Sequence, residues 1–380
     1  MVFIDPGYQA FYKNEMFNEE SSLNRDGQFA PGILLKERLA QQGIALNTAD
    51  YLLRGELTGK INIYSSMGIL ANYKKFLNQD NVFLQSFYII EGPNTVPLQY
   101  WNLRSLVEFF DKVYVLNTEG IGYEKCYDSR FQLQKTYFPE VQEEIIEELW
   151  NNKKRGFITL INSNKLILPM TRIVKRKNGA GFPLRLIRNP GTTNTELYSE
   201  RLRALVAFQK LGDIDLYGYG WDTSFSKNIR DILKTQQIPY MYWRYKKELM
   251  SIYRGTVKSK YETLSKYRFS FCFENMAMPG WITEKIFDCI YVGTVPIYLG
   301  APDIGKYIPK NCFIDIRDFS SYKELYEYLK NLSNIDIETF KNKGKEYLTT
   351  EQYKSFTKES FVEQFEKDLI DTLNANGVQL

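Results

Sequence analysis

The sequence predicts an α/β protein with two parallel-sheet domains. Apolar strand signals alternate with amphipathic helix signals along the chain, which is the pattern of strand-helix-strand units. With 380 residues, of which 44% are hydrophobic, the chain is too long for one typical domain and can bury two cores. The run Asn-Asn-Lys-Lys-Arg at 151–155 is a plausible linker. We therefore expect an N-terminal domain over 1–155 and a C-terminal domain over 156–350.

The N-terminal half supplies a first set of strands and helices. Short apolar runs bounded by turn residues predict strands, and apolar residues at helical spacing predict helices. In chain order we expect a strand at 2–5, a helix at 32–42, strands at 61–64 and 81–90, a helix at 104–110 and a strand at 112–116. A charged, helix-like segment at 140–154 then leads into the linker.

The C-terminal half restarts the same alternation. We expect a strand at 156–162, a long loop at 175–193, a helix at 196–210, a strand ending at 215–218, and helices at 323–332 and 358–373. The loop is rich in Lys, Arg, Gly and Pro, and it is either simply solvated or a flap that faces a substrate. Residues 351–380 are expected to form a C-terminal helix that could pack back on the N-terminal domain.

The segment 267–313 contains the strongest functional signal. Alternating aromatic residues predict a buried strand that ends at Glu274, and a Pro-Gly pair then breaks the chain. Thr283 can serve as the N-cap of a helix over 284–291, and residues 294–299 predict the next strand. This is a strand-helix-strand unit whose polar residues gather at the carboxyl edge of a sheet.

Glu284 and Lys285 fall in the first turn of that helix. The free backbone N–H groups and the helix dipole favour a phosphate there, and the lysine adds a full positive charge. The glutamate would repel a phosphate, so we expect it to accept hydrogen bonds from the ribose hydroxyls of a nucleotide. The plainer interpretation is a surface charge pair that tunes the helix dipole.

The segment closely resembles the donor-binding signature of family 10 glycosyltransferases, the α-1,3-fucosyltransferases. The family pattern is Phe-Glu-Asn, an aromatic residue, Glu-Lys, and Gly-x-Val-Pro followed by a glycine. In this chain it reads Phe273-Glu274-Asn275, Trp281, Glu284-Lys285, Gly293-Thr294-Val295-Pro296 and Gly300. Trp281 stands where the family often has a tyrosine, which leaves the identity of the donor sugar open.

The resemblance implies the GT-B fold, in which two Rossmann-like α/β/α domains face each other across a cleft. The donor would bind to the C-terminal domain and the acceptor to the N-terminal one. The residues expected to bind the donor are Arg201, Arg203, Glu274, Asn275, Trp281, Thr283, Glu284 and Lys285. Arg201 is favoured over Arg203 for the diphosphate. Glu91, which ends an apolar strand before Gly92-Pro93, is the expected catalytic base, although it could also be an ordinary exposed carboxylate.

Composition excludes several other classes of protein. Histidine is absent, so no Ser-His-Asp triad and no histidine metal site can form. The 49 basic and 45 acidic residues are too balanced for a nucleic-acid binder. The four cysteines lie far apart in sequence and are expected to be reduced core thiols. No window has the length of a membrane span and no export signal is visible, which favours a cytoplasmic protein, with peripheral contact at the inner membrane as a further expectation.

Two short motifs resemble binding sites for a metal or a nicotinamide cofactor, but neither fits its pattern. Asp213-Ile214-Asp215 spells the metal-binding DxD of a different glycosyltransferase fold, but it leads into a strand instead of a loop. Gly218-Tyr219-Gly220 lacks the third glycine of a dinucleotide fingerprint. We therefore expect neither a metal nor a nicotinamide cofactor.

The family resemblance thus implies an inverting glycosyltransferase that needs no metal and uses a GDP-sugar. GDP-β-L-fucose is the donor that the resemblance implies, with an α-1,3 linkage to an oligosaccharide or lipid-linked glycan such as O-antigen. One alternative keeps the fold and uses another GDP-deoxyhexose. A second alternative is a module that binds a nucleotide sugar without catalysis.

Overall fold

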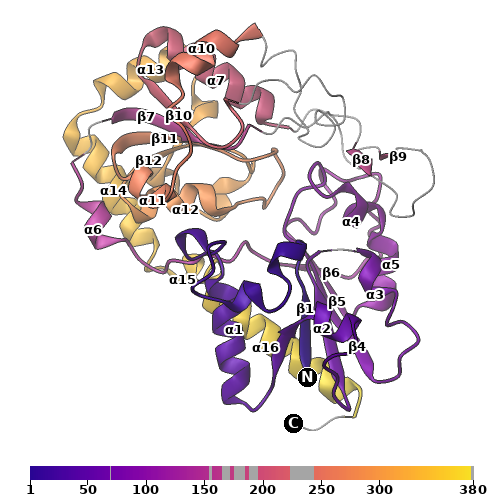
Figure 1. Ribbon diagram of the computed structural model, residues 1–380. Helices are drawn as coiled ribbons and strands as arrows, with labels where there is room; N and C mark the ends of the chain where they lie inside the picture. The colour runs from indigo at the N-terminus through magenta and orange to yellow at the C-terminus, as the bar shows by residue number, and fades with distance from the viewer. Residues whose placement is uncertain are drawn as a thin grey trace. The chain divides into compact units, whose positions relative to one another are not determined.

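The chain forms two compact units, which are drawn in Figure 1. The structure is a computed structural model, and it describes residues 1–68, 70–153, 156–164, 172–174, 185–187, 196–222 and 244–377. The first unit comprises residues 1–141 and 354–380, and the second comprises residues 142–353. In the part of the chain described, no helix combines the length and apolarity that a membrane crossing requires.

The first unit is built on a six-stranded sheet with the order β2-β1-β3-β4-β5-β6. Every neighbouring pair of these strands is parallel, and Val2 of β1 pairs with Leu46 of β2 and Ile63 of β3. The strands are β1 (Val2–Asp5), β2 (Leu46–Thr48), β3 (Asn62–Ser66), β4 (Val82–Ile89), β5 (Lys112–Val115) and β6 (Leu133–Lys135). Because the strands are parallel, the loops that follow them all leave from one edge of the sheet.

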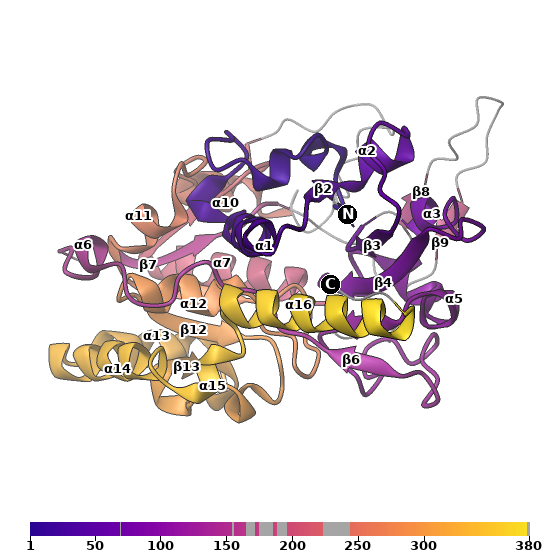
Figure 2. The same ribbon diagram turned by 90° about the horizontal axis from the view of Figure 1, so that it is seen from below.

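Helices cover both faces of the first sheet. The helices of this unit are α1 (Ala30–Gln41), α2 (Ala49–Leu53), α3 (Leu70–Tyr73), α4 (Pro97–Trp101), α5 (Leu103–Phe109) and α16 (Lys358–Ala375). On one face Leu35 and Leu39 of α1 and Phe365 and Leu369 of α16 share a core with Tyr88 of β4. Figure 2 shows α16 running along the sheet. On the other face the ring of Phe110, just after α5, packs on Phe87 and Tyr64.

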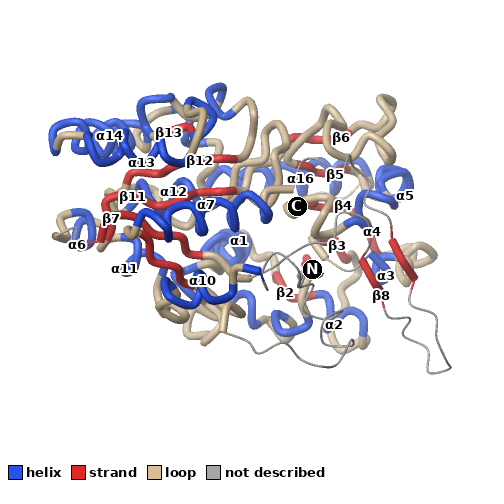
Figure 3. Tube along the Cα trace, turned by 90° about the horizontal axis from the view of Figure 1, so that it is seen from above, coloured by secondary structure: helices blue, strands red, loops and turns tan. Residues whose placement is uncertain are grey.

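The second unit has a five-stranded parallel sheet with the order β10-β7-β11-β12-β13. Figure 3 shows β7, β11 and β12 side by side. The strands are β7 (Gly156–Ile161), β10 (Ile214–Tyr217), β11 (Tyr267–Phe273), β12 (Val295–Leu299) and β13 (Ile314–Asp315), and a separate antiparallel pair is formed by β8 (Arg172–Val174) and β9 (Arg185–Ile187). The loop expected over 175–193 lies outside the described residues except at β9.

The helices of the second unit also lie on both faces of its sheet. They are α6 (Glu147–Trp150), α7 (Tyr198–Leu211), α10 (Lys246–Ile252), α11 (Lys260–Leu264), α12 (Glu284–Tyr291), α13 (Tyr322–Asn331), α14 (Asn334–Tyr347) and α15 (Glu351–Lys354). Side chains alternate along β11: Phe271 packs on Phe208 of α7, whereas Cys272 contacts Cys289 of α12. Helices α7 and α12 therefore lie on opposite faces.

Most predicted elements are confirmed within one or two residues, and α12 and β1 have the predicted bounds. The helix expected over 140–154 is wrong in extent, because only α6 is helical there. The Ile146 N–H donates to the Tyr291 carbonyl, and the Trp150 ring lies against Gly293, so this segment packs on the second unit. The second unit thus begins at residue 142, ahead of the linker that the sequence suggested.

Candidate functional site

The carboxyl ends of β11 and β12 bring the motif residues of the second unit together. Alternate residues of β11 bury aromatic rings against α7, which fixes the strand and places Glu274 at its end. The Glu274 N–H donates to the Leu299 carbonyl at the end of β12. Gly293 has a positive φ of 63° between α12 and β12, a conformation that favours glycine, so the chain can turn directly from helix to strand.

Glu274 is fully buried and lies at the beginning of α12. Its carboxylate accepts hydrogen bonds from the Thr283 N–H at 2.9 Å and from the Thr283 hydroxyl at 2.8 Å. Thr283 occupies the predicted N-cap position but makes no capping bond to the helix with its side chain. The Thr283 hydroxyl donates to the buried carboxylate and does not cap the helix, so the capping role expected of this side chain is wrong.

Lys285 carries the positive charge at this end of the helix. Its Nζ lies 3.2 Å from the Glu274 carboxylate and donates to the Thr283 hydroxyl at 2.7 Å. Burial by itself lowers the pKa of Lys285, but the charges of Glu274 and Glu284 outweigh that effect and raise it. The lysine is therefore charged at every ordinary pH and held in one place by a buried carboxylate.

Glu284 is half-buried next to Lys285, with the two charged groups 3.4 Å apart. Burial opposes ionisation of Glu284, yet the charges of Lys285 and Lys260 lower its pKa to about 2. The side chain is thus a permanent anion that can accept hydrogen bonds, as the ribose-binding hypothesis requires. That role stays a prediction.

Arg201 of α7 is buried beside the end of β11. Its Nη2 donates to the Phe273 carbonyl at 2.6 Å and to the Asn275 side-chain oxygen at 3.0 Å, and the guanidinium lies 4.7 Å from the centre of the Tyr198 ring. Burial lowers the pKa of Arg201. Its Nε and Nη1 have no hydrogen-bond partner within the described ranges. Buried N–H groups without hydrogen bonds are costly, so a bound anion here would stabilise the arginine by accepting hydrogen bonds from Nε and Nη1.

Arg203 lies on a different face of α7. Its guanidinium forms an ion pair with Glu200 at 2.7 Å, and the side chain is exposed. Residues two apart on a helix point in nearly opposite directions, so the two arginines cannot serve the same site. The structure brings Arg201, and not Arg203, next to Asn275 and the end of β11.

Trp281 is buried in the turn between β11 and α12, and its indole N–H has no partner in the described part of the chain. The turn itself is held by contacts that sequence reasoning missed. The Asp303 carboxylate accepts from the Gly280 N–H at 2.8 Å, and the Tyr298 hydroxyl donates to the Trp281 carbonyl at 3.5 Å. The only sequence signal for Asp303 is its place three residues after the motif glycine Gly300.

Cys272 and Cys289 are in contact, which their spacing in the sequence did not indicate. Their sulfur atoms are 3.3 Å apart across β11 and α12, although seventeen residues separate them in the chain. Both are free and buried, and burial raises the pKa of Cys272 well above its ordinary value. A thiol with a raised pKa is a poor nucleophile, which agrees with the predicted role of Cys272 as a core residue.

Glu91 belongs to the first unit and follows β4 at the carboxyl edge of the first sheet. Its side chain is half-buried, and its backbone carbonyl accepts from the Tyr100 hydroxyl at 3.1 Å. Tyr100 is buried in α4, so the chain direction at Glu91 is fixed by a side chain from the following helix.

The two aspartates of the DxD-like motif lie at the other end of the second unit's sheet. Both are at the amino end of β10, whereas Glu274 follows the carboxyl end of β11, and the strands are parallel. Asp213 pairs with Lys330 at 2.5 Å, and Asp215 pairs with Arg254 at 2.6 Å. Each carboxylate is therefore already matched with a cation.

Two α/β units, each built on a parallel sheet, are the architecture of the GT-B fold. A solved α-glucosyltransferase, bound in that structure to UDP and a 13-mer DNA, has this fold. It aligns over 97% of this chain and 98% of its own, with 12% identity and a TM-score of 0.53. A solved α1,3-fucosyltransferase aligns over 97% of this chain and 90% of its own, with 16% identity and a TM-score of 0.48.

Residues 191–365 match the carboxyl-terminal domain of glycosyltransferase family 10 (fucosyltransferase). This part of the chain is therefore a family 10 glycosyltransferase domain, and the predicted resemblance is confirmed. The α-(1,3)-fucosyltransferase FucT of Helicobacter pylori is 42% identical over 76 residues. That match covers 20% of this chain and 16% of the relative, so the chain is matched to only about a sixth of that protein's length.

Proposed function

We propose that the chain is an inverting glycosyltransferase that moves L-fucose from GDP-β-L-fucose to a glycan hydroxyl in an α-1,3 linkage. The observation that carries this proposal is the buried Arg201, with two guanidinium nitrogen atoms that lack partners among the described residues. It lies at the same sheet edge as Lys285 within a family 10 domain. A diphosphate would satisfy the arginine and the lysine together.

The donor would bind along the end of β11. Arg201 and Lys285 would hold the diphosphate, and the anionic Glu284 would accept from the ribose hydroxyls. Asn275 and Trp281 would line the α-phosphate and the sugar. Glu274 and Thr283 would act indirectly, because they bond to each other and to Lys285. Their role would be to hold the Lys285 side chain in position.

The chemical step would need one base and two cations. The Glu91 carboxylate would take the proton of the acceptor hydroxyl while the oxygen of that hydroxyl bonds to the anomeric carbon of fucose. The bond from that carbon to the diphosphate breaks as the sugar passes through an oxocarbenium-like state, and the configuration inverts. Arg201 and Lys285 would stabilise the charge on the departing GDP. Because two side-chain cations supply this charge, we propose that the reaction needs no metal.

The acceptor would be an oligosaccharide or a lipid-linked glycan, and a surface polysaccharide such as O-antigen is the setting we propose. This setting would place the protein in the cytoplasm, with peripheral contact at the inner membrane. Trp281 supports one alternative, a different GDP-deoxyhexose donor, because an indole stands where the family often has a tyrosine. A donor panel that compares wild type with Trp281→Tyr separates the two donors.

The test is incubation of the pure protein with GDP-fucose, EDTA and a panel of N-acetyllactosamine-type and bacterial oligosaccharides. The expected result is one deoxyhexose added to a panel member, seen by mass spectrometry, with the chelator present. A strict Mn²⁺ requirement would contradict the metal-free reaction. Normal binding of GDP without turnover would favour a non-catalytic nucleotide-sugar module instead.

A further inference from the structure

Three large apolar side chains are exposed at the carboxyl edge of the first unit's sheet. Tyr8, which follows β1, is 65% exposed, and Leu98 and Trp101 of α4 are 38% and 40% exposed. Leu98 and Trp101 are three residues apart and lie on the same side of α4. We call these three side chains the apolar rim. Exposed aromatic groups of this size at a sheet edge where ligands commonly bind need an explanation.

A chain of contacts between neighbouring residues links the rim to Glu91. Gly7, next to Tyr8, lies so close to Gly68 after β3 that a Cβ on Gly68 would collide with the Gly7 backbone. The Gly68 carbonyl accepts from the Gln99 side chain at 3.0 Å, and Tyr100, the next residue, donates to the Glu91 carbonyl. One side of α4 thus holds the loops that follow β3 and β4, while its other side exposes Leu98 and Trp101.

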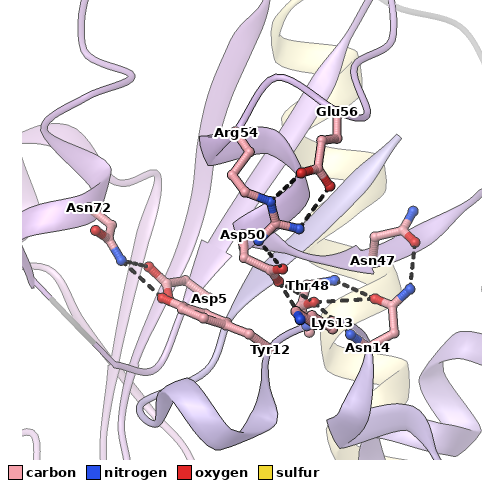
Figure 4. Close-up of polar contacts among 10 residues, drawn as sticks. All are labelled: Asp5, Tyr12, Lys13, Asn14, Asn47, Thr48, Asp50, Arg54, Glu56 and Asn72. Atoms are coloured by element: carbon pink, nitrogen blue, oxygen red, sulfur yellow. Dashed lines mark hydrogen bonds and ion pairs between the residues drawn. The ribbon is translucent and has the colours of Figure 1, made fainter.

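The loop that carries Tyr8 is held rigidly at its other end by two buried carboxylates, as Figure 4 shows. The Asp5 carboxylate accepts from the Tyr12 hydroxyl at 2.9 Å and from the Asn72 side chain at 2.9 Å. The Lys13 N–H donates to Asp50 at 3.1 Å. The Asn14 N–H donates to the Thr48 hydroxyl at 2.9 Å.

The backbone of this loop is also strained. Lys13 and Asn14 have φ values of 60° and 62°, a left-handed conformation that is rare outside glycine. Such conformations persist only where the surrounding structure imposes them, and they are concentrated at binding sites. The Tyr8 ring, though exposed, lies edge-on against Phe11, which packs in the same manner on Phe29. The ring is therefore oriented in advance and loses little freedom when a ligand binds it.

We propose that the apolar rim is a platform for the acceptor glycan, with a pyranose ring packed on Trp101 and a second on Tyr8. This inference rests on the proposed function, and it assigns residues to acceptor binding. A pyranose has an apolar face of C–H groups that gains from burial against an aromatic ring, and its hydroxyls stay in water. The rim lies at the edge where Glu91 would deprotonate the acceptor. A lipid surface is the other class of ligand that exposed aromatic residues bind, and the test distinguishes it.

The test uses the full chain, with the panel oligosaccharide that gives product with wild type. Trp101→Ala and Tyr8→Ala should each raise the KM for that acceptor by about tenfold, which corresponds to a loss of about 1.4 kcal/mol in binding. The KM for GDP-fucose, GDP binding by calorimetry and donor hydrolysis without acceptor should be unchanged. Trp101→Phe and Tyr8→Phe, which keep a ring, should stay within about threefold of wild type.

The matched control is Tyr328→Ala. Tyr328 is an exposed tyrosine of α13 whose ring packs on Phe319, and it lies in the second unit away from its motif residues. Its removal should leave the acceptor KM unchanged. Unchanged acceptor KM in both rim alanine variants would overturn the proposal, as would reduced binding to phosphatidylglycerol vesicles with normal acceptor KM. Lack of product with every acceptor, or lack of GDP binding by wild type, would refute the proposed function itself.

Discussion

The Nζ atom of Lys285 lies 3.2 Å from the fully buried carboxylate of Glu274. The pair couples two roles, because the carboxylate that fixes the lysine also holds the Thr283 N–H and hydroxyl at the beginning of α12. The lysine that we propose for the diphosphate thus also balances a buried anion. We expect any variant of one partner to affect both the proposed donor site and the fold, so the two effects must be separated experimentally.

We expect Lys285→Met to weaken GDP binding by tenfold or more, since a charged hydrogen bond contributes about 1.5–3 kcal/mol. The variant should also lower the free energy of unfolding by about 3 kcal/mol, because Glu274 is left buried without its cation. The double variant Glu274→Gln/Lys285→Met should recover much of that stability and none of the GDP affinity. Calorimetry and urea unfolding measure the two quantities, and recovery of GDP binding in the double variant would exclude the lysine from the diphosphate site.

Arg201→Lys should weaken GDP binding by about ten- to a hundredfold. A lysine keeps the charge but cannot present two N–H groups in the fixed plane of a guanidinium. Arg203→Ala is the matched control from the same helix, and it should leave GDP affinity unchanged because Arg203 pairs with Glu200 in solvent. Equal losses in the two variants would show that GDP affinity depends on α7 as a whole and not on Arg201.

The sequence could predict the parts of the site that depend on local pattern. The bounds of α12 follow from a turn, a polar N-terminus and a glycine, all within fifteen residues. The choice between Arg201 and Arg203 could not be settled in that way. It depends on which face of α7 meets β11, and that is decided by contacts between residues about seventy positions apart.

Other contacts could not be predicted from the sequence because they also depend on how separate segments come together. The hydrogen bonds that Thr283 donates to Glu274 and that Tyr100 donates to Glu91 can be foreseen only if one knows how the intervening turn folds back. Helix α14 was missed although its start carries a local signal, a capping box in which Ser333 and Asp336 bond reciprocally. Its C-terminal half, with the sequence KNKGKEY, is polar and contains a glycine, which concealed the helix.

The buried carboxyl group of Asp288, paired with the half-buried Lys260, should give stability a distinct pH dependence. Burial raises the pKa of Asp288 to about 6 from an ordinary value of 3.8, although Lys260 opposes this at 2.5 Å. Between these two pH values the native state binds more protons than the unfolded state, so this carboxyl group's contribution to stability falls as pH rises. This loss in the free energy of unfolding is at most about 3 kcal/mol, and we expect Asp288→Asn to abolish it. Urea unfolding at pH 4.5 and pH 6.5 measures it, and an identical change in wild type and variant would contradict it.

Gly300→Ala should disturb the donor site through packing alone. An added Cβ would come within 2.5 Å of the Glu274 side chain and would also collide with the Tyr298 hydroxyl. We expect a loss of about 1–3 kcal/mol of stability together with weaker GDP binding, because Glu274 must move and Lys285 with it. Gly305→Ala is the control five residues later, where a Cβ would meet nothing within 4 Å. Thermal unfolding and calorimetry compare the two, and similar behaviour in both variants would show that Gly300 is not sterically required.

Replacement of Glu91 tests the proposed chemistry most directly. Glu91→Gln should lower kcat for transfer by a factor of about 10² to 10⁴, the usual contribution of a general base. GDP affinity should hold, because the groups proposed to bind GDP all lie in the second unit. Glu108→Gln is the control for loss of one carboxylate from the first unit, since Glu108 is exposed on α5. Single-turnover transfer assays beside GDP calorimetry separate chemistry from binding. If Glu91→Gln transfers fucose at the wild-type rate, the proton must go to another group, and the acidic side chains of the first unit become the next candidates.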